Sequence, residues 1–241
     1  MMNDLYVLGV TPARAGSKRV PRKNGRLLAG RPLLTYSIEA LCASKHVDAV
    51  ILSTDDEEFA AKGAEYGAKT LALRPSELSN DRARLFEVLA HELNSYEAYI
   101  GRKVDIVVSA QASAPLVRPE TIDAVVELCA NDGVEAVGTT SVIVHGHPYL
   151  ARRRRRDGSL EEAFALGDDV ARYPSQVRPE FEYFDGCVFA RRRSMLAPPD
   201  PQTNALGNKP HGVRSKEDES INIDTEFDFK LAEFFMSGRA S

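Results

Sequence analysis

Six cationic side chains follow an apolar run near the start of the chain. The run, Leu5–Val10, has the composition of a buried strand, and the prolines and glycines that come after it disfavour regular structure until about Pro32. A polar loop that leaves a buried strand is where α/β proteins place ligands, because its backbone N–H groups are free. The loop therefore predicts a polyphosphate site, with a solvated basic loop as the alternative. Its cations are Arg14, Lys18, Arg19, Arg22, Lys23 and Arg26.

The same segment lacks two common phosphate-binding motifs. It contains neither the G-x-x-x-x-G-K-S/T spacing of a P-loop nor the G-x-G-x-x-G of a dinucleotide-binding fold. A different arrangement of cations and backbone must hold the phosphates.

A second polar constellation lies near the carboxyl end of the chain. In S-I-N-I-D-T, the two-residue period of a strand would place Asn222 and Asp224 on one face, where their oxygens could bind Mg²⁺. The local pattern also fits a helix start, with Thr225 capping a helix over Glu226–Met236 and Asp228 completing a capping box. In that alternative Asp224 only favours the positive end of the helix, and local pattern by itself favours this alternative.

The elements that must position these residues alternate between strands and helices. Such alternation predicts a mainly parallel sheet covered on both faces, with ligands at the carboxyl ends of the strands. The segments Arg14–Gly25 and Ala110–Pro115 should then face one crevice. The expected strands are Leu5–Val10, Ala49–Ser53, Thr70–Leu73, Val104–Ala110 and Ala136–Val144, and the expected helices are Leu33–Ala43, Glu57–Tyr66, Leu85–Tyr99 and Thr121–Cys129.

The alternation stops after Val144. We interpret residues 144–179 as an insertion in a single domain of 241 residues. The run Arg152–Arg156 could suggest RNA, but a local basic run in an acidic protein is more typical of a loop or a subunit contact. His145 and His147 lack further ligands and fit a turn better than a metal site. An apolar run at Cys187–Ala190 and a proline-rich loop at Ala197–Pro201 follow.

Composition limits the functional class. A net charge of −4 with 43% hydrophobic residues argues against general nucleic-acid or membrane binding. The three cysteines, Cys42, Cys129 and Cys187, are far apart and form no C-x-x-C pair, so a reducing compartment is expected. No secretory leader or apolar run of roughly 18 residues is evident. We therefore expect a cytoplasmic protein.

Taken together, these motifs resemble the acylneuraminate cytidylyltransferases, the CMP-sialic acid synthetases, over the whole chain. The opening motif is similar to Ala13–Lys18 followed by Pro21–Asn24, and later elements are similar to Ser53–Asp56, Leu73–Leu78, Gln111–Pro115 and Ile221–Thr225. The order and spacing of these elements agree from end to end.

The resemblance implies a three-layer, Rossmann-like α/β nucleotidyltransferase fold and a reaction of CTP with a nine-carbon 2-keto acid sugar, which yields a CMP-sugar and pyrophosphate. It also implies a homodimer, in which the insertion at about 144–179 is the dimerisation element. By position in the motifs, Arg14, Lys18 and Lys23 would bind the triphosphate; Asn24, Arg74 and the backbone at Ala83 would hold ribose and base; Gln111 would contact the sugar; and Asp224 would hold Mg²⁺.

The chain departs from the family pattern near the expected metal and sugar. Asn222 replaces the first aspartate of I-D-I-D, which predicts weaker Mg²⁺ binding or a single ion. Asp185, which would border the sugar, replaces an asparagine, and Ala112–Ala114 replaces Pro-Thr-Ser. Arg84 replaces a small hydroxyl residue beside the nucleotide. A nucleotide-binding homologue without turnover, or a transferase for another ulosonic acid or for GTP, therefore remain alternatives.

Overall fold

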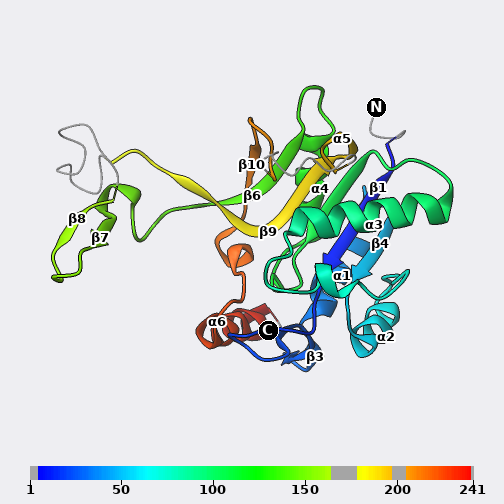
Figure 1. Cartoon of the computed structure of the whole chain (residues 1–241), viewed down its shortest axis with the longest axis horizontal. Helices are drawn as coiled ribbons and strands as arrows, with labels where there is room; N and C mark the ends of the chain where they lie inside the picture. Colours follow the sequence, from blue (N-terminus) through cyan, green and yellow to red (C-terminus); the bar gives the residue numbers. More distant parts are fainter. Residues whose placement is uncertain (1–4, 164–177, 197–204, 240–241) are drawn as a thin grey trace. The chain divides into compact units, whose positions relative to one another are not determined.

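A computed structural model describes residues 5–163, 178–196 and 205–239 (Figure 1). The chain forms two compact units. The larger unit contains the chain up to residue 140 and from residue 184 onward, and the smaller unit is residues 141–183. The expected insertion, 144–179, falls within the smaller unit, although its residues 164–177 and the expected loop Ala197–Pro201 lie outside the described residues.

A six-stranded sheet forms the centre of the larger unit, with the strand order β10-β6-β9-β5-β1-β4. β1 pairs in parallel with both β4 and β5, β10 pairs in parallel with β6, and β9 is antiparallel to β5. The strands are β1 (Val7–Pro12), β4 (Ala49–Ser53), β5 (Ile106–Ala110), β6 (Ala136–Val142), β9 (Glu182–Arg192) and β10 (His211–Arg214).

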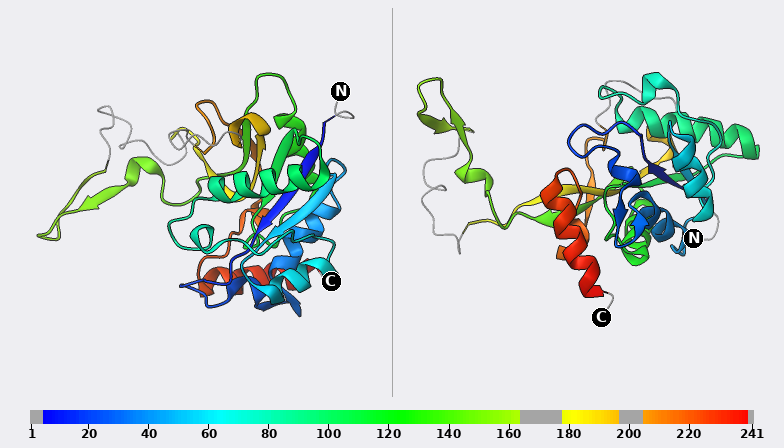
Figure 2. Two further views of the ribbon diagram at one scale, coloured as in Figure 1. Left: turned by 45° about the vertical axis from the view of Figure 1, so that its right-hand side comes forward. Right: turned by 90° about the horizontal axis from the view of Figure 1, so that it is seen from below.

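Helices cover both faces of this sheet and make three layers (Figures 1 and 2). One core cluster joins α1, α2 and α4 to the sheet, and a second joins α3 and α5 to the opposite face. The helices are α1 (Leu34–Cys42), α2 (Glu57–Glu65), α3 (Leu85–Ile100), α4 (Pro119–Cys129), α5 (Arg193–Leu196) and α6 (Glu226–Arg239). The mainly parallel sheet between helical layers confirms the predicted α/β class.

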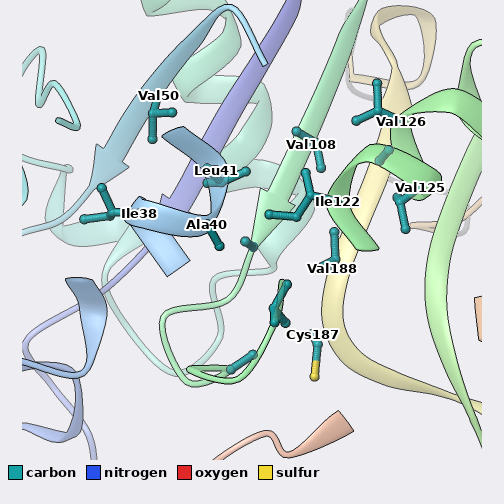
Figure 3. Packing of buried hydrophobic residues seen from close by; sticks show 14 of the residues in the cluster. Ile38, Ala40, Leu41, Val50, Val108, Ile122, Val125, Val126, Cys187 and Val188 are labelled. Carbon is teal, nitrogen blue, oxygen red and sulfur yellow. The ribbon is translucent and has the colours of Figure 1, made fainter. Parts of the chain in front are cut away.

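Side-chain alternation explains how continuous apolar strands serve two cores. In β5, Ile106 and Val108 pack in the first cluster, whereas Val107 packs in the second. Figure 3 shows Val108 of β5 beside Ile122 of α4. Fully buried aliphatic side chains of this kind stabilise the fold by about 1.5–3 kcal/mol each.

Two strand predictions are wrong. Thr70–Leu73 is not a strand: only Lys69 bridges to Ile51, after which the chain turns away, and the Arg74 N–H donates to the Thr54 carbonyl at 2.7 Å. Residues 221–224 are not a strand either, because the segment runs between the loop after β5 and the loop after β1 and pairs with no strand in the described part of the chain. Alternating apolar residues in a short segment can equally be buried by loops.

Helix α6 packs against a small hairpin that ends the first loop. The hairpin strands are β2 (Leu27–Leu28) and β3 (Arg31–Pro32), and a third cluster joins Leu28 to Ile223 and Phe229. Figure 2 shows α6 beside this region. The hairpin therefore links the loop after β1 to the carboxyl-terminal segment.

The smaller unit contains a two-stranded hairpin, β7 (Arg152–Arg154) and β8 (Leu160–Glu162), with antiparallel pairing. Within the arginine run, Arg155 forms an ion pair with Glu161 at 2.7 Å. The segment before it is a turn, as predicted: Gly146 has φ of 69°, and His147 caps the short 3₁₀ helix η4 (Pro148–Leu150).

In the parts of the chain that the structure describes, no helix has both the length and the apolar character needed to cross a bilayer.

Candidate active site

A cleft of about 470 Å³ opens in the larger unit, beyond the carboxyl ends of β1 and β5. Five cationic side chains and two carboxylates line it, so it is locally positive in a protein of net negative charge. The two segments expected to share a crevice both contribute. The lining residues are Pro12, Arg14, Gly16, Ser17, Lys18, Arg19, Lys23 and Asn24 of the first loop; Arg74, Leu78, Asn80, Asp81, Ala83, Leu85 and Val88; and Gln111, Ser113 and Asp224.

The first loop is held in shape by polar contacts to its backbone. The buried Asn24 amide donates to the Arg14 carbonyl at 3.0 Å, and Asp55 accepts from the Ala15 N–H at 2.8 Å. These contacts come from the two motifs Pro21–Asn24 and Ser53–Asp56. Asn24 therefore shapes the loop in addition to lining the cleft.

Arg14 and Lys18 converge on one carboxylate. The Arg14 guanidinium donates to Asp81 Oδ1 at 2.7 Å, and the Lys18 ammonium contacts Oδ2 of the same side chain. The hydrogen bonds from Lys18 and Arg14 lower the pKa of Asp81. Two of the three cations predicted to bind the triphosphate are thus brought together at one point.

Lys23 joins the first loop to the carboxyl-terminal segment. Its Nζ lies 3.2 Å from Asp224 Oδ1 and also donates to the Ile223 carbonyl. The Ile223 N–H donates to the Ser113 carbonyl at 2.8 Å. Lys23, Ser113 and Asp224 consequently meet at one end of the cleft, and only 13% of the Lys23 side chain is exposed.

Two anchors fix the backbone on either side of Asp224. Before it, the fully buried Glu219 accepts from Arg118 Nη1 at 2.9 Å and from the Thr121 hydroxyl at the start of α4. After it, the predicted capping box is confirmed: the Thr225 N–H donates to Asp228 at 2.8 Å, and the Asp228 N–H donates to Thr225 Oγ1 at 3.2 Å. The cap and a role for Asp224 in the cleft are therefore compatible.

Arg74 is the most buried cation of the cleft, with 6% of its surface exposed. Its Nε donates to Ser79 Oγ at 3.2 Å. Burial lowers the pKa of Arg74, and the nearby carboxyls of Asp55 and Glu92 act in the opposite direction. A guanidinium stays charged under these conditions, so Arg74 supplies a fixed positive charge at the floor of the site.

The loop expected to contact the base is organised by Asn80. Asn80 Oδ1 accepts from the N–H groups of Arg82, at 2.8 Å, and Ala83, at 3.2 Å. Ala83 lines the cleft, but its N–H is used within this turn. Arg84 does not line the cleft; its guanidinium donates to Glu87 at 2.8 Å in the first turn of α3.

Gln111, directly after β5, also lines the cleft, and its side chain has an unpaired hydrogen-bond donor among the described residues. Its side-chain nitrogen Nε2 is buried and has no hydrogen-bond partner in the described part of the chain. Its backbone is fixed, because the Gln111 N–H donates to the Cys187 carbonyl at 2.9 Å. A buried unpaired donor costs roughly 1–3 kcal/mol, which favours a ligand acceptor at this position.

Asp185 and Asn222 lie near the backbone of Gln111 but do not line the cleft. Asp185 is buried, where it accepts from Ser215 Oγ at 2.8 Å and from Thr139. Asn222 Nδ2 donates to the Gly186 carbonyl at 3.3 Å, while Asn222 Oδ1 is buried without a partner in the described residues. The predicted roles of Asp185 in sugar binding and of Asn222 in metal binding stay predictions.

Asp81 is the charged residue of the cleft that the sequence analysis did not predict. Asp81 is two positions before Ala83, which was expected to contact the nucleotide. This closeness in sequence could have pointed to Asp81 as a residue of the site. Its pairing with Arg14 and Lys18 depends on tertiary structure, because 67 positions separate it from Arg14.

The sequence pattern of one known family matches residues 8–155 of this chain; the family is described as Cytidylyltransferase. The match covers more than half of the chain. The chain belongs to the cytidylyltransferase family. The matched segment includes the basic loop, Arg74, Asp81 and Gln111, which together form most of the cleft. The resemblance to the acylneuraminate cytidylyltransferases is confirmed by the relatives below.

Individual relatives of this cytidylyltransferase agree with the family. The CMP-N,N'-diacetyllegionaminic acid synthase of Legionella pneumophila is 30% identical over 96% of this chain and 97% of its own length. The N-acylneuraminate cytidylyltransferase of Escherichia coli is 43% identical over 39% of this chain and 22% of its own length. A solved CMP:2-keto-3-deoxy-manno-octonic acid synthetase complexed with CTP has the same fold, with a TM-score of 0.71, 17% identity, and coverage of 97% of this chain and 99% of that one.

Proposed function

We propose that this protein transfers a cytidylyl group from CTP to a sialic-acid-like 2-keto acid sugar and releases pyrophosphate. The observation that carries the proposal is the meeting of Arg14, Lys18, Lys23 and Asp224 in one cleft. The relatives supply the class of substrate, since those described above are synthases or transferases of CMP-linked ulosonic acids.

In the proposed reaction, the anomeric hydroxyl oxygen of the sugar attacks the α-phosphorus of CTP. The new P–O bond to the sugar forms as the bond to the β-phosphate oxygen breaks, the hydroxyl proton passes to solvent, and pyrophosphate leaves. Catalysis of this kind depends on positioning and on neutralising charge rather than on a covalent intermediate. Arg14 and Lys18 would neutralise the polyphosphate, and the half-buried Gln111 would orient the sugar through Nε2.

Each cation suits a different part of this task. The planar guanidinium of Arg14 can bind two phosphate oxygens at once, whereas Lys23 is a compact point charge. Lys23 is 13% exposed and fixed by the Ile223 carbonyl and Asp224, so it would present its charge without reorganising. Preorganised charge of this kind stabilises a transition state more than mobile charge does.

The residues present fit one Mg²⁺ ion. Asp224 offers a carboxylate that is 62% exposed on the cleft, whereas Asn222 does not line the cleft, so the carboxylate oxygens of Asp224 would be the main protein ligands. Oxygen ligands of this kind suit Mg²⁺, which would polarise the α-phosphoryl group when bound. The described residues contain no cluster of three or more His, Cys, Asp or Glu side chains suited to a metal, so most of its ligands would be phosphate oxygens and water.

The test of the proposal is a direct assay. Purified protein is incubated with CTP, Mg²⁺ and a panel of 2-keto acid sugars, pyrophosphate is quantified, and the products are identified by mass spectrometry. We expect a CMP-sugar and pyrophosphate in equal amounts with at least one sugar. CTP binding without pyrophosphate release from any sugar would contradict the proposal.

A nucleotide-binding homologue without turnover is the second candidate. It is favoured by the amide of Asn222, which is bonded to Gly186 where the family pattern has a carboxylate. Calorimetry with CTP, combined with the assay above, separates the two. A parallel assay with GTP tests base preference, which depends on hydrogen bonds that one base makes and the other leaves unpaired.

We also propose that two copies associate through residues 141–183. Large apolar side chains of this small unit are solvent-exposed: Val144 by 72% and Leu160 by 57%. Contiguous exposed apolar patches are typical of interfaces, and these side chains are candidates to contribute to one. Analytical ultracentrifugation should show a dimer, and Leu160→Glu should shift it toward monomer; a monomeric wild-type protein would overturn the proposal.

With CTP as substrate, the reaction would take place in the cytoplasm.

A further inference from the structure

Asp81 is an acidic side chain at the centre of the predicted polyphosphate site. Its two carboxylate oxygens are divided between two cations: Oδ1 accepts from Arg14 at 2.7 Å, and Oδ2 contacts Lys18. A carboxylate whose two oxygens contact an arginine and a lysine makes the same kind of charged contacts that a phosphate would make with these cations. Asp81 therefore satisfies the very donors that the substrate would require.

The Asp81 backbone is held by its own turn, whereas one of its two partners is largely exposed. The turn before it is fixed by Asn80, whose Nδ2 donates to the Glu77 carbonyl at 2.7 Å and whose Oδ1 accepts from Arg82 at 2.8 Å. By contrast, the Lys18 side chain is 83% exposed on a long stem. The carboxylate is thus presented from a hydrogen-bonded turn, and the exposed Lys18 ammonium is accessible to a competing anion.

The geometry leads to a specific role within the proposed function. We propose that Asp81 competes with polyphosphate for Arg14 and Lys18 and thereby sets the affinity of the cleft for pyrophosphate and for the nucleoside triphosphate. Binding is then an exchange, in which phosphate oxygens replace the carboxylate. When pyrophosphate leaves, Asp81 takes the two cations back, which favours release of the product.

The net charge of the three side chains predicts the direction of the change in pyrophosphate affinity. Arg14, Lys18 and Asp81 together carry one net positive charge, and replacing Asp81 by asparagine raises this to two. The pairs are partly exposed, so each contributes little in water and the effect on affinity is moderate. We expect Asp81→Asn to bind pyrophosphate about fivefold more tightly than the wild type, with a steeper loss of affinity as salt is added.

The test is calorimetry with inorganic pyrophosphate, first in the presence of a chelator and then with Mg²⁺. Glu77→Gln is the matched control, because it makes the same charge change on the same segment without lining the cleft. The Glu77→Gln variant should bind pyrophosphate with the same affinity as the wild type. The double variant Arg14→Ala with Asp81→Asn should gain less from the Asp81 change than the single variant does.

The outcomes separate this inference from the function on which it rests. If the wild type binds pyrophosphate and Asp81→Asn binds it equally or more weakly, with unchanged thermal stability, Asp81 positions the cations instead of competing for them and the inference is overturned. If Glu77→Gln tightens binding as much as Asp81→Asn, the effect is general charge and the inference also fails. If the wild type forms no CMP-sugar, the proposed function fails, whatever the result for Asp81.

Discussion

Lys23 Nζ lies 3.2 Å from Asp224 Oδ1, although the two residues are 201 positions apart in the chain. This ion pair joins the basic loop after β1 to the acidic position before α6. It also places a cation next to the carboxylate that we propose for Mg²⁺. The two ends of the chain therefore form one site, and several predictions about it can be tested.

Lys23→Met should lower kcat/KM for CMP-sugar synthesis about 100-fold, because a preorganised charge in the cleft is lost. Methionine keeps most of the aliphatic stem. Lys62→Met, on the exposed face of α2, is the control and should retain activity. Steady-state kinetics measure both. Activity of Lys23→Met within about twofold of the wild type, a change of roughly 0.4 kcal/mol in the barrier, would contradict the role of Lys23.

Asp224→Asn should raise the Mg²⁺ concentration needed for half-maximal activity by about tenfold or more, because a neutral amide replaces the proposed carboxylate ligand. The measurement is a Mg²⁺ titration of pyrophosphate release at saturating CTP. Glu233→Gln on α6 removes one charge from the same helix region and should leave the titration unchanged. Identical Mg²⁺ curves for wild type and Asp224→Asn would argue that the ion binds elsewhere.

Asn222→Asp should destabilise the metal-free protein. The Asn222 amide donates to the Gly186 carbonyl at 3.3 Å, and an aspartate would place an acceptor against that acceptor. Loss of such a partly buried hydrogen bond costs about 1 kcal/mol. Thermal melts in chelator should therefore show a lower Tm, and Mg²⁺ should recover part of it. A variant with unchanged Tm in chelator would show that the Gly186 contact is unimportant.

Gln111→Leu should separate stability from function. Gln111 Nε2 is buried and has no partner among the described residues, so its removal should leave the free energy of unfolding unchanged or raise it by about 1 kcal/mol. The KM for the sugar should rise about tenfold, whereas the Kd for CTP should stay within about twofold. Chemical unfolding, sugar kinetics and CTP calorimetry test the three parts. Equal weakening for sugar and CTP would place Gln111 elsewhere in the cleft.

Glu97 should control acid stability. It accepts from Arg193 Nε at 2.6 Å and from the Val104 N–H at 2.9 Å, and chiefly the Arg193 hydrogen bond lowers the pKa of Glu97 to about 2. Because the folded pKa lies below the unfolded value of about 4.5, this stabilisation is complete above pH 4.5 and is lost as pH falls toward 2.

Urea unfolding across this range should therefore show that Glu97→Gln is less stable than the wild type near neutral pH, by the order of 2–3 kcal/mol, with the gap narrowing in acid. Glu65→Gln removes an exposed partner of Lys62 and should change stability by about 0.5 kcal/mol or less. A difference between Glu97→Gln and wild type that does not vary with pH would contradict this assignment.

Local patterns were sufficient for much of the fold. The predicted strand Ala49–Ser53 is β4, the helical patterns at 33–43 and 85–99 match α1 and α3 within a few residues, and the Thr225–Asp228 cap is present. Such features depend on neighbours a few positions away, so hydrophobic period and cap chemistry predict them. The same holds for the basic loop, whose prolines and glycines exclude regular structure.

Only the tertiary structure decided which of these residues meet. Residues 221–224 have the period of a strand but run between loops, with Ile223 buried and Asp224 exposed, and β9 enters the sheet beside β5 in the antiparallel sense. The contact of Arg14 and Lys18 with Asp81 follows from how the loop after β1 packs against the segment before α3, and no local pattern encodes it. By itself the sequence determined the chemistry that each segment carries. The packing of distant segments determined the pairing of charges, because ion pairs form wherever the folded chain brings opposite charges within about 4 Å.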